Sequence, residues 1–180
     1  FFSGEGGIPF IRVTTSRATA VISLLGGQVL SYRPLESNND LLFVSRKAYY
    51  EIGKATKGGA PICWPWFAAN PKDDSLPFHG FVRNALWEVE ETGLHDNDNV
   101  EVILTFRDSE ETRRIWPYQF TLVQEISIGD CLRIDLTSRN TGDEVFSLTQ
   151  AIHTYFNVGN ISQTSVSGLE GRSYLDKVEE

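Results

Sequence analysis

The chain reads FTLVQEISI over Phe120–Ile128, then Gly129-Asp130, then CLRIDLTS over Cys131–Ser138. In both runs apolar residues recur mainly at every second position. This period places them together on one face of a β-strand. A Gly-Asp pair between two such runs is typical of a tight hairpin turn. The stretch therefore predicts two paired antiparallel strands, each with one buried face.

Similar short runs, rich in Val, Ile, Thr and aromatic residues, occur on both sides of this hairpin. Glycine, asparagine and aspartate clusters separate them, and only Asp108–Arg114 has the pattern of a helical turn. Many short strands without long helices between them indicate an antiparallel all-β architecture. The other expected strands are Ile11–Val13, Thr19–Leu25, Gln28–Tyr32, Leu41–Val44, Trp87–Glu91, Val100–Phe106, Phe146–His153 and Thr164–Ser167.

Composition describes one folded domain over residues 1–180, with 41% hydrophobic and 22% charged residues. No apolar stretch approaches the roughly 18 residues of a membrane span, so we expect no membrane partner. The net charge of −8 argues against binding to nucleic acid or to anionic membranes. A small anionic ligand is still compatible with it, because a few local cations dominate at short range.

Cysteine use leaves two alternatives open. Cys63 and Cys131 fit a reducing cytosol at least as well as a single disulfide, and Phe1–Phe10 has no signal-peptide pattern. We therefore expect a cytoplasmic protein. No spaced set of metal ligands occurs in the chain, so we expect no metal site. The lack of a nucleophile elbow, a P-loop and a dinucleotide fingerprint argues against serine hydrolases, kinases and Rossmann oxidoreductases.

The stretch from Gly58 to Arg83, GGAPICWPWFAANPKDDSLPFHGFVR, breaks the strand pattern. Its four prolines argue against a central strand, and its many aromatic residues argue against disorder. We expect an ordered loop that lines a cavity. Its aromatic rings suit the C–H face of a pyranose, although they could equally be core residues; they belong to Trp64, Trp66, Phe67, Phe78 and Phe81.

Three histidines are the candidate acid–base groups. His95 lies in the polar run Leu94–Asn99 and is expected to be a solvated turn residue. His79 lies in the aromatic loop, and His153 ends a predicted strand. Taken alone, each of these two is more often a structural, hydrogen-bonded histidine than a catalyst.

Several motifs in the same order along the chain resemble the hexose-6-phosphate mutarotase branch of the aldose 1-epimerase family. The resemblance covers nearly the whole chain, from about Gly27 to Asp176. The motifs are KGGAPICWPWF (57–67), HGFVRN (79–84) with Trp87, WPYQF (116–120), NTG (140–142), HTYF (153–156), GLEG (168–171) and YLD (174–176).

The resemblance implies a galactose-mutarotase-like β-supersandwich that interconverts the α and β anomers of an aldohexose 6-phosphate and needs no cofactor or metal. It implies His153 as the acid and His79 as a sugar-binding residue. Arg83 and Lys57 would hold the 6-phosphate, although Lys57 replaces an arginine frequent in relatives and loses its bidentate geometry. Trp66 and Phe78 would contact the substrate, and Phe78 stands where some relatives have a polar glutamine.

One expected feature of the family is not matched. Its general base is a glutamate in the last third of the domain, and the carboxylates Glu170, Asp176, Glu179 and Glu180 do not fit that motif. We expect residues 1–180 to be the N-terminal two-thirds of a larger domain, incomplete at its C-terminus; loss of the base is the alternative. A non-catalytic carbohydrate-binding sandwich and an epimerase for neutral sugars are the other functional hypotheses. We expect a monomer.

Overall fold

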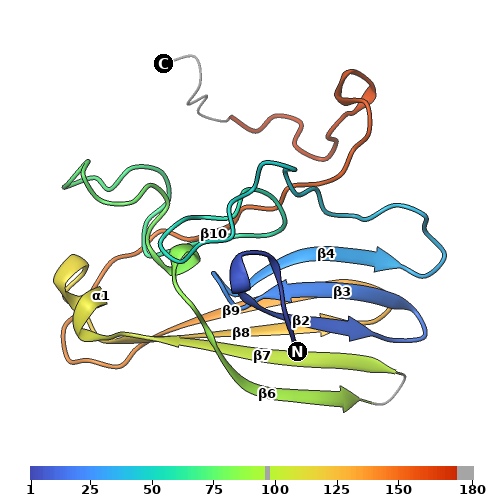
Figure 1. Cartoon of the computed structure of the whole chain (residues 1–180). Helices are drawn as coiled ribbons and strands as arrows, with labels where there is room; N and C mark the ends of the chain where they lie inside the picture. Colours follow the sequence, from blue (N-terminus) through green and yellow to red (C-terminus); the bar gives the residue numbers. More distant parts are fainter. Residues whose placement is uncertain (96–97, 174–180) are drawn as a thin grey trace.

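Two four-stranded antiparallel sheets dominate the structure, a computed structural model that describes residues 1–95 and 98–173 (Figure 1). The strands follow chain order in both sheets, β1 to β4 in the first and β6 to β9 in the second. A short ladder pairs β5 with β10. In chain order the elements are β1 Phe2–Ser3, η1 Glu5–Gly7, β2 Pro9–Thr14, β3 Ala18–Ser23, β4 Gln28–Pro34, β5 Ile62–Cys63, η2 Val82–Asn84, β6 Glu88–His95, β7 Asn99–Arg107, α1 Glu110–Ile115, β8 Phe120–Ile128, β9 Leu132–Asn140, β10 Ala151–Ile152 and η3 Ile161–Gln163.

The predicted hairpin is confirmed. β8 and β9 pair antiparallel from Phe120 opposite Asn140 to Ile128 opposite Leu132. Their turn is tied to the other sheet, because the Tyr32 hydroxyl on β4 donates a hydrogen bond to the Gly129 carbonyl at 2.9 Å.

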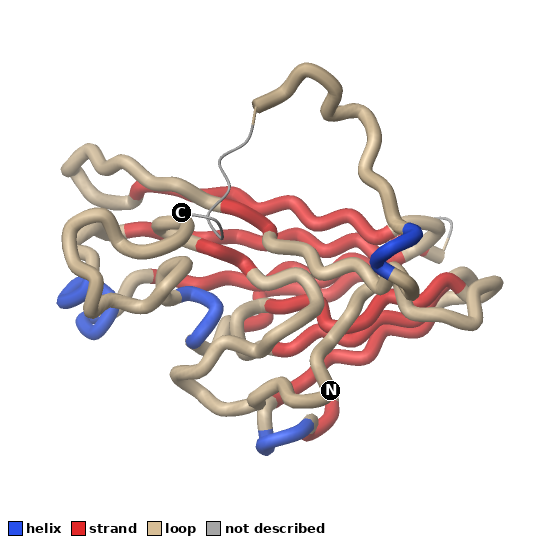
Figure 2. The backbone as a smooth tube through the Cα atoms, turned by 90° about the horizontal axis from the view of Figure 1, so that it is seen from above, coloured by secondary structure: helices blue, strands red, loops and turns tan. Residues whose placement is uncertain are grey.

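The inner faces of the two sheets form one apolar core. Ile22 of β3 and Leu122 and Ile126 of β8 are fully buried in the same cluster. Trp64 is also fully buried and packs on Phe120, with ring centroids 4.4 Å apart. Seen from above, the strands run through the middle of the molecule, loops surround their ends, and the helical turns are short (Figure 2). The predicted antiparallel all-β architecture is confirmed.

Three expected strands are wrong or too long. Leu41–Val44 makes only isolated bridges, and Phe146–His153 is reduced to Ala151–Ile152. Thr164–Ser167 forms no strand within the described part of the chain. In each case suitable residues lack a full-length partner, and strand propensity needs a neighbouring strand to be realised.

The expectation that the prolines exclude a central strand from the aromatic loop is confirmed: in the described part of the chain, the loop contains only the short strand β5, which pairs with β10 alone in a two-stranded sheet. Pro61 and Pro65 lie just outside β5, whose two residues pair with β10. The predicted helical turn is confirmed as α1. It begins with a capping box, in which the Ser109 side chain accepts from Thr112 N–H and the Thr112 hydroxyl accepts from Ser109 N–H.

Candidate functional site

The β5–β10 ladder carries His153 to the aromatic loop. His153 N–H donates to the Pro61 carbonyl at 2.9 Å, and Tyr155 N–H donates to the Gly59 carbonyl at 2.8 Å. Residues two apart on an extended segment point to the same side. The side chains of His153 and Tyr155 therefore share one face, beside the loop that contains His79.

His79 is held by a backbone clamp. Its N–H donates to the Ala68 carbonyl at 2.7 Å, and Ala68 N–H donates to His79 Nδ1 at 2.9 Å. Both residues have left-handed backbone conformations, with φ of 65° and 66°. Such conformations are strained for residues other than glycine and persist only where the surroundings impose them. The clamp thus fixes both the backbone and the ring of His79.

The two histidines meet although they are far apart in the sequence. Their ring centroids are 5.7 Å apart at an interplanar angle of 65°. Phe67 lies against both, 4.7 Å from the ring of His79 and 6.4 Å from that of His153. Phe78 contacts His79 at 4.3 Å, and Tyr155 stacks on His153 at 4.9 Å. The two histidine rings are therefore in contact with each other and are flanked by the aromatic rings of these three residues.

Burial, helped by nearby Arg83 and His153, lowers the pKa of His79 from 6.5 to about 4. His79 is therefore neutral at pH 7. Because the Ala68 amide can only donate, Nδ1 must accept, and the ring proton must sit on Nε2. His79 is thus a neutral hydrogen-bond donor through Nε2 and has no proton to deliver as an imidazolium at that pH.

Arg83 lies half-buried beside the pair, on the short η2 turn. One guanidinium nitrogen, Nη2, donates to the Phe78 carbonyl at 2.6 Å. Its Nε is buried and has no hydrogen-bond partner among the described residues. Burial lowers the pKa of Arg83, and neighbouring Cys63 and Tyr155 oppose that shift. The site therefore contains a partly desolvated cation with unused hydrogen-bonding capacity.

The remaining predicted site residues lie less centrally. Trp66 is only 5% exposed, and its Nε1–H donates to the Pro77 carbonyl at 2.9 Å. Lys57 is exposed, and its carbonyl accepts from Ser45 N–H. It lies two residues before Gly59, the partner of Tyr155, at the end of the segment that carries the site. The structure thus brings His79, His153, Phe78 and Arg83 together. The Lys57 side chain makes no hydrogen bond or ion pair with them among the described residues.

Within residues 1–95 and 98–173, no carboxylate is hydrogen-bonded to His79 or His153 and no cluster of three or more potential metal ligands occurs. Glu170 is exposed and accepts from Gly168 N–H at 3.2 Å. Asp176, Glu179 and Glu180 lie outside the described residues, as does the YLD motif.

The third histidine is separate from this site. His95 is the last residue of β6 rather than a turn residue, and its exposed ring lies 3.1 Å from a carboxylate oxygen of Glu101. Asp96 and Asn97 of the predicted turn lie outside the described residues. His95 is solvated, as expected.

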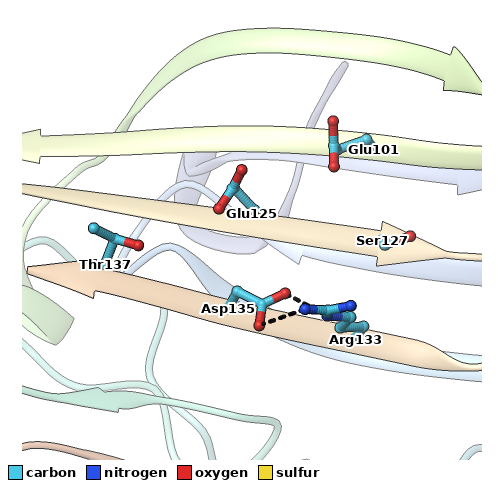
Figure 3. Close-up of a pocket in the computed structure, with 6 residues that line it drawn as sticks. All are labelled: Glu101, Glu125, Ser127, Arg133, Asp135 and Thr137. Carbon is cyan, nitrogen blue, oxygen red and sulfur yellow. Dashed lines mark hydrogen bonds and ion pairs between the residues drawn. The ribbon is translucent and has the colours of Figure 1, made fainter.

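Two hollows lie away from the histidines. One, of about 450 Å³, is on the outer face of strands β7–β9, where Arg133 and Asp135 form an ion pair of 2.6 Å (Figure 3). Its other lining residues are Glu101, Glu125, Ser127 and Thr137. A second, of about 560 Å³, has an aromatic wall that includes Trp66, Trp116 and Phe146. Neither contains His79, His153 or Arg83.

Residues 9–179 match the family model described as "Aldose 1-epimerase". The chain belongs to the aldose 1-epimerase family. An Escherichia coli K12 protein named "Putative glucose-6-phosphate 1-epimerase" is 39% identical over 95% of this chain and 55% of its own length. The chain spans about half the length of the curated relatives it matches.

Solved structures agree with the family. A Salmonella typhimurium protein described as a "putative mutarotase" superposes with a TM-score of 0.77 at 35% identity, over 84% of this chain and 49% of that one. A galactose mutarotase related enzyme from Lactobacillus acidophilus, at 20% identity, has a TM-score of 0.68 over 87% of this chain and 52% of that one. The expected galactose-mutarotase-like fold is confirmed.

Two contributors to the site were not predicted from the sequence. Ala68 acts through its backbone, and nothing about an alanine indicates a left-handed conformation. Tyr155 could have been found, because its spacing of two residues from His153 on an extended run places both side chains on one face.

Proposed function

We propose that the protein interconverts the α and β anomers of an aldohexose 6-phosphate of the glucose 6-phosphate type. The observation that carries the proposal is the contact between His79 and His153 inside an aromatic wall, with Arg83 beside them. Family membership and the printed names of the relatives support the same reaction class.

The chemistry needs one acid and one base. A base removes the proton from the anomeric O1 while an acid protonates the ring oxygen O5; the C1–O5 bond breaks as the C1=O1 bond forms. Rotation about C1–C2 presents the other carbonyl face, and the reverse transfers close the ring. His153 is the proposed acid, since imidazole is suited to proton transfer near neutral pH.

His79 has a different role in this proposal. As a neutral Nε2–H donor it hydrogen-bonds a sugar oxygen and holds the ring next to His153. Phe67 and Phe78, which are 45% and 55% exposed, offer apolar faces to the C–H side of the sugar. Trp66 would support this wall from behind rather than stack on the ring directly.

Arg83 is the proposed main phosphate ligand, because a half-buried guanidinium beside the histidine pair offers charge-assisted hydrogen bonds. Lys57 adds a second positive charge at the margin. The described residues assign no general base, so that role stays open in the proposal. A cytoplasmic, monomeric protein also stays a prediction; the free thiols of Cys63 and Cys131 are compatible with a reducing compartment.

Polarimetry of freshly dissolved α-glucose 6-phosphate tests the reaction, with the full-length protein. We expect equilibration faster than the spontaneous rate and a loss of at least about a hundredfold in His153→Ala. His95→Ala, which changes an exposed histidine outside the site, is the matched control and should retain full activity. A spontaneous rate with the unmodified protein, or full activity in His153→Ala, would refute the proposal.

Substrate class is tested separately. Arg83→Ala combined with Lys57→Ala should raise KM for the phosphorylated sugar while leaving slow turnover of the neutral hexose unchanged. Equal losses for both sugars would point to an epimerase for neutral sugars instead.

A further inference from the structure

Among the described residues, Tyr155 has the aromatic ring nearest to that of His153, and it has no role in the reaction proposed above. Its ring centroid lies 4.9 Å from that of His153, and the two planes are within 25° of parallel. Phe67, the other near-parallel ring, is farther away at 6.4 Å. An offset stack of this kind favours one orientation of both rings.

The backbone of Tyr155 is held on both sides. Its N–H donates to the Gly59 carbonyl at 2.8 Å, and its own carbonyl accepts from Phe43 N–H at 2.9 Å. The phenol ring therefore starts from an anchored backbone, although the residue is 36% exposed. Anchoring matters because a small displacement of a proton donor from its productive geometry reduces the rate of transfer steeply.

The imidazole nitrogens of His153 make no hydrogen bond within the described part of the chain, whereas its backbone N–H donates to Pro61. This distinguishes His153 from His79, whose ring is clamped by Ala68. The orientation of the His153 ring is thus left to its aromatic neighbours.

We propose that Tyr155 is a positioning residue that holds the imidazole plane of His153 through ring stacking. The expected change in kcat rests on the proposed function, whereas the stacking of the two rings does not. It assigns the effect to the ring and not to the hydroxyl.

Two substitutions separate ring from hydroxyl. Tyr155→Phe keeps the stack, and we expect kcat within about twofold of the unmodified enzyme. Tyr155→Leu removes the stack, and we expect kcat to fall about three- to tenfold with KM little changed, as for the loss of one aromatic pair. Tyr49→Leu, at an exposed tyrosine outside the site, should change neither constant.

A lower kcat in Tyr155→Leu, with KM and the unfolding midpoint unchanged, is the readout that a merely structural role would not give, and phenylalanine should restore it. Equal losses of kcat in Tyr155→Phe and Tyr155→Leu would assign the effect to the hydroxyl and overturn the proposal. Unchanged kcat in Tyr155→Leu would overturn it as well. Unfolding midpoints check that each variant folds, and Tyr155→Met replaces Tyr155→Leu if the latter does not.

A second measurement is independent of activity. Proton NMR of the His153 ring should show a ring-current shift that is retained in Tyr155→Phe and lost in Tyr155→Leu. If the unmodified protein fails to accelerate anomer exchange, the proposed function fails while this measurement still decides the stacking. Identical His153 ring resonances in all three proteins would overturn the positioning role.

Discussion

Gly80 is the position at which a single added methyl group should be most damaging to the site. It follows His79 directly, has φ of +74°, and bridges to Trp64 in the core. A Cβ atom built on Gly80 would lie 1.8 Å from the Trp64 carbonyl oxygen and 2.9 Å from Pro65 N. Both obstacles are backbone atoms, which cannot rotate away.

The expected cost of Gly80→Ala has two parts. A left-handed conformation costs a residue with a Cβ about 1–2 kcal/mol. Relieving the overlap with the Trp64 carbonyl costs about 1–3 kcal/mol more, by analogy with overpacked cores. We therefore expect a loss of about 2–5 kcal/mol in the free energy of unfolding.

Gly7→Ala is the matched control. Gly7 has the same φ of +74°, but beyond its chain neighbours no described atom lies within 4 Å of the place that its methyl group would take. It should incur only the conformational cost, about 1–2 kcal/mol. Equilibrium unfolding in urea measures the free energy of unfolding of both variants, provided that its slope against urea concentration is the same in all the proteins compared. Equal destabilisation by Gly80→Ala and Gly7→Ala would refute the argument that the Trp64 carbonyl demands a glycine.

Three further predictions follow from burial and charge. Folding lowers the pKa of His79 from 6.5 to about 4, so the unfolded chain binds this proton at a higher pH than the folded protein does. As the pH falls from 6.5 to 4, the free energy of unfolding should therefore decrease by about 1–2 kcal/mol, after allowance for the partial exposure of the ring. Urea unfolding against pH should show this component in the unmodified protein and not in His79→Gln; identical pH dependence in both would contradict it. Cys131 is exposed, whereas Cys63 is buried, and burial raises the pKa of its thiol. An aromatic disulfide reagent should therefore modify Cys131 in the native protein and Cys63 only after unfolding. Rapid modification of both thiols in the native protein would contradict this. Leu122 is fully buried, so Leu122→Ala should lower the free energy of unfolding by about 2–5 kcal/mol. Val145 is 91% exposed, so Val145→Ala should lower it by less than about 0.5 kcal/mol. Similar losses in the two variants would argue against the core as described.

The parts of the fold that sequence predicted well are those decided by local pattern. In β8 and β9, alternation and a Gly-Asp turn specify faces, register and hairpin together. Leu41–Val44 has an equally suitable composition, yet it makes only bridges because its neighbours in space are loop segments. Strand pairing between distant segments is a tertiary property, so residue type alone does not determine it.

In the site, too, local sequence predicted which residues take part, whereas their conformations depend on tertiary contacts. Motif resemblance identified the residues that gather around the histidine pair, but not how they are held. The left-handed backbone of Ala68 arises from its contacts with His79, and alanine ordinarily avoids that conformation. The burial of Trp66 is likewise a consequence of packing against Phe81, and its residue type was equally compatible with an exposed sugar platform.

The two histidines illustrate why residue identity does not determine role. Burial, together with the nearby Arg83 cation, lowers the pKa of His79 and keeps its ring neutral. Because Nδ1 accepts the Ala68 N–H, the neutral ring can donate only from Nε2. His153 uses its backbone N–H in the ladder to Pro61, and its ring meets the stacked phenol of Tyr155. A second protonated imidazole 5.7 Å away would repel the first. Keeping His79 neutral therefore removes that repulsion and assigns the two rings different parts in the proposed reaction, His79 as a hydrogen-bond donor and His153 as the proposed acid.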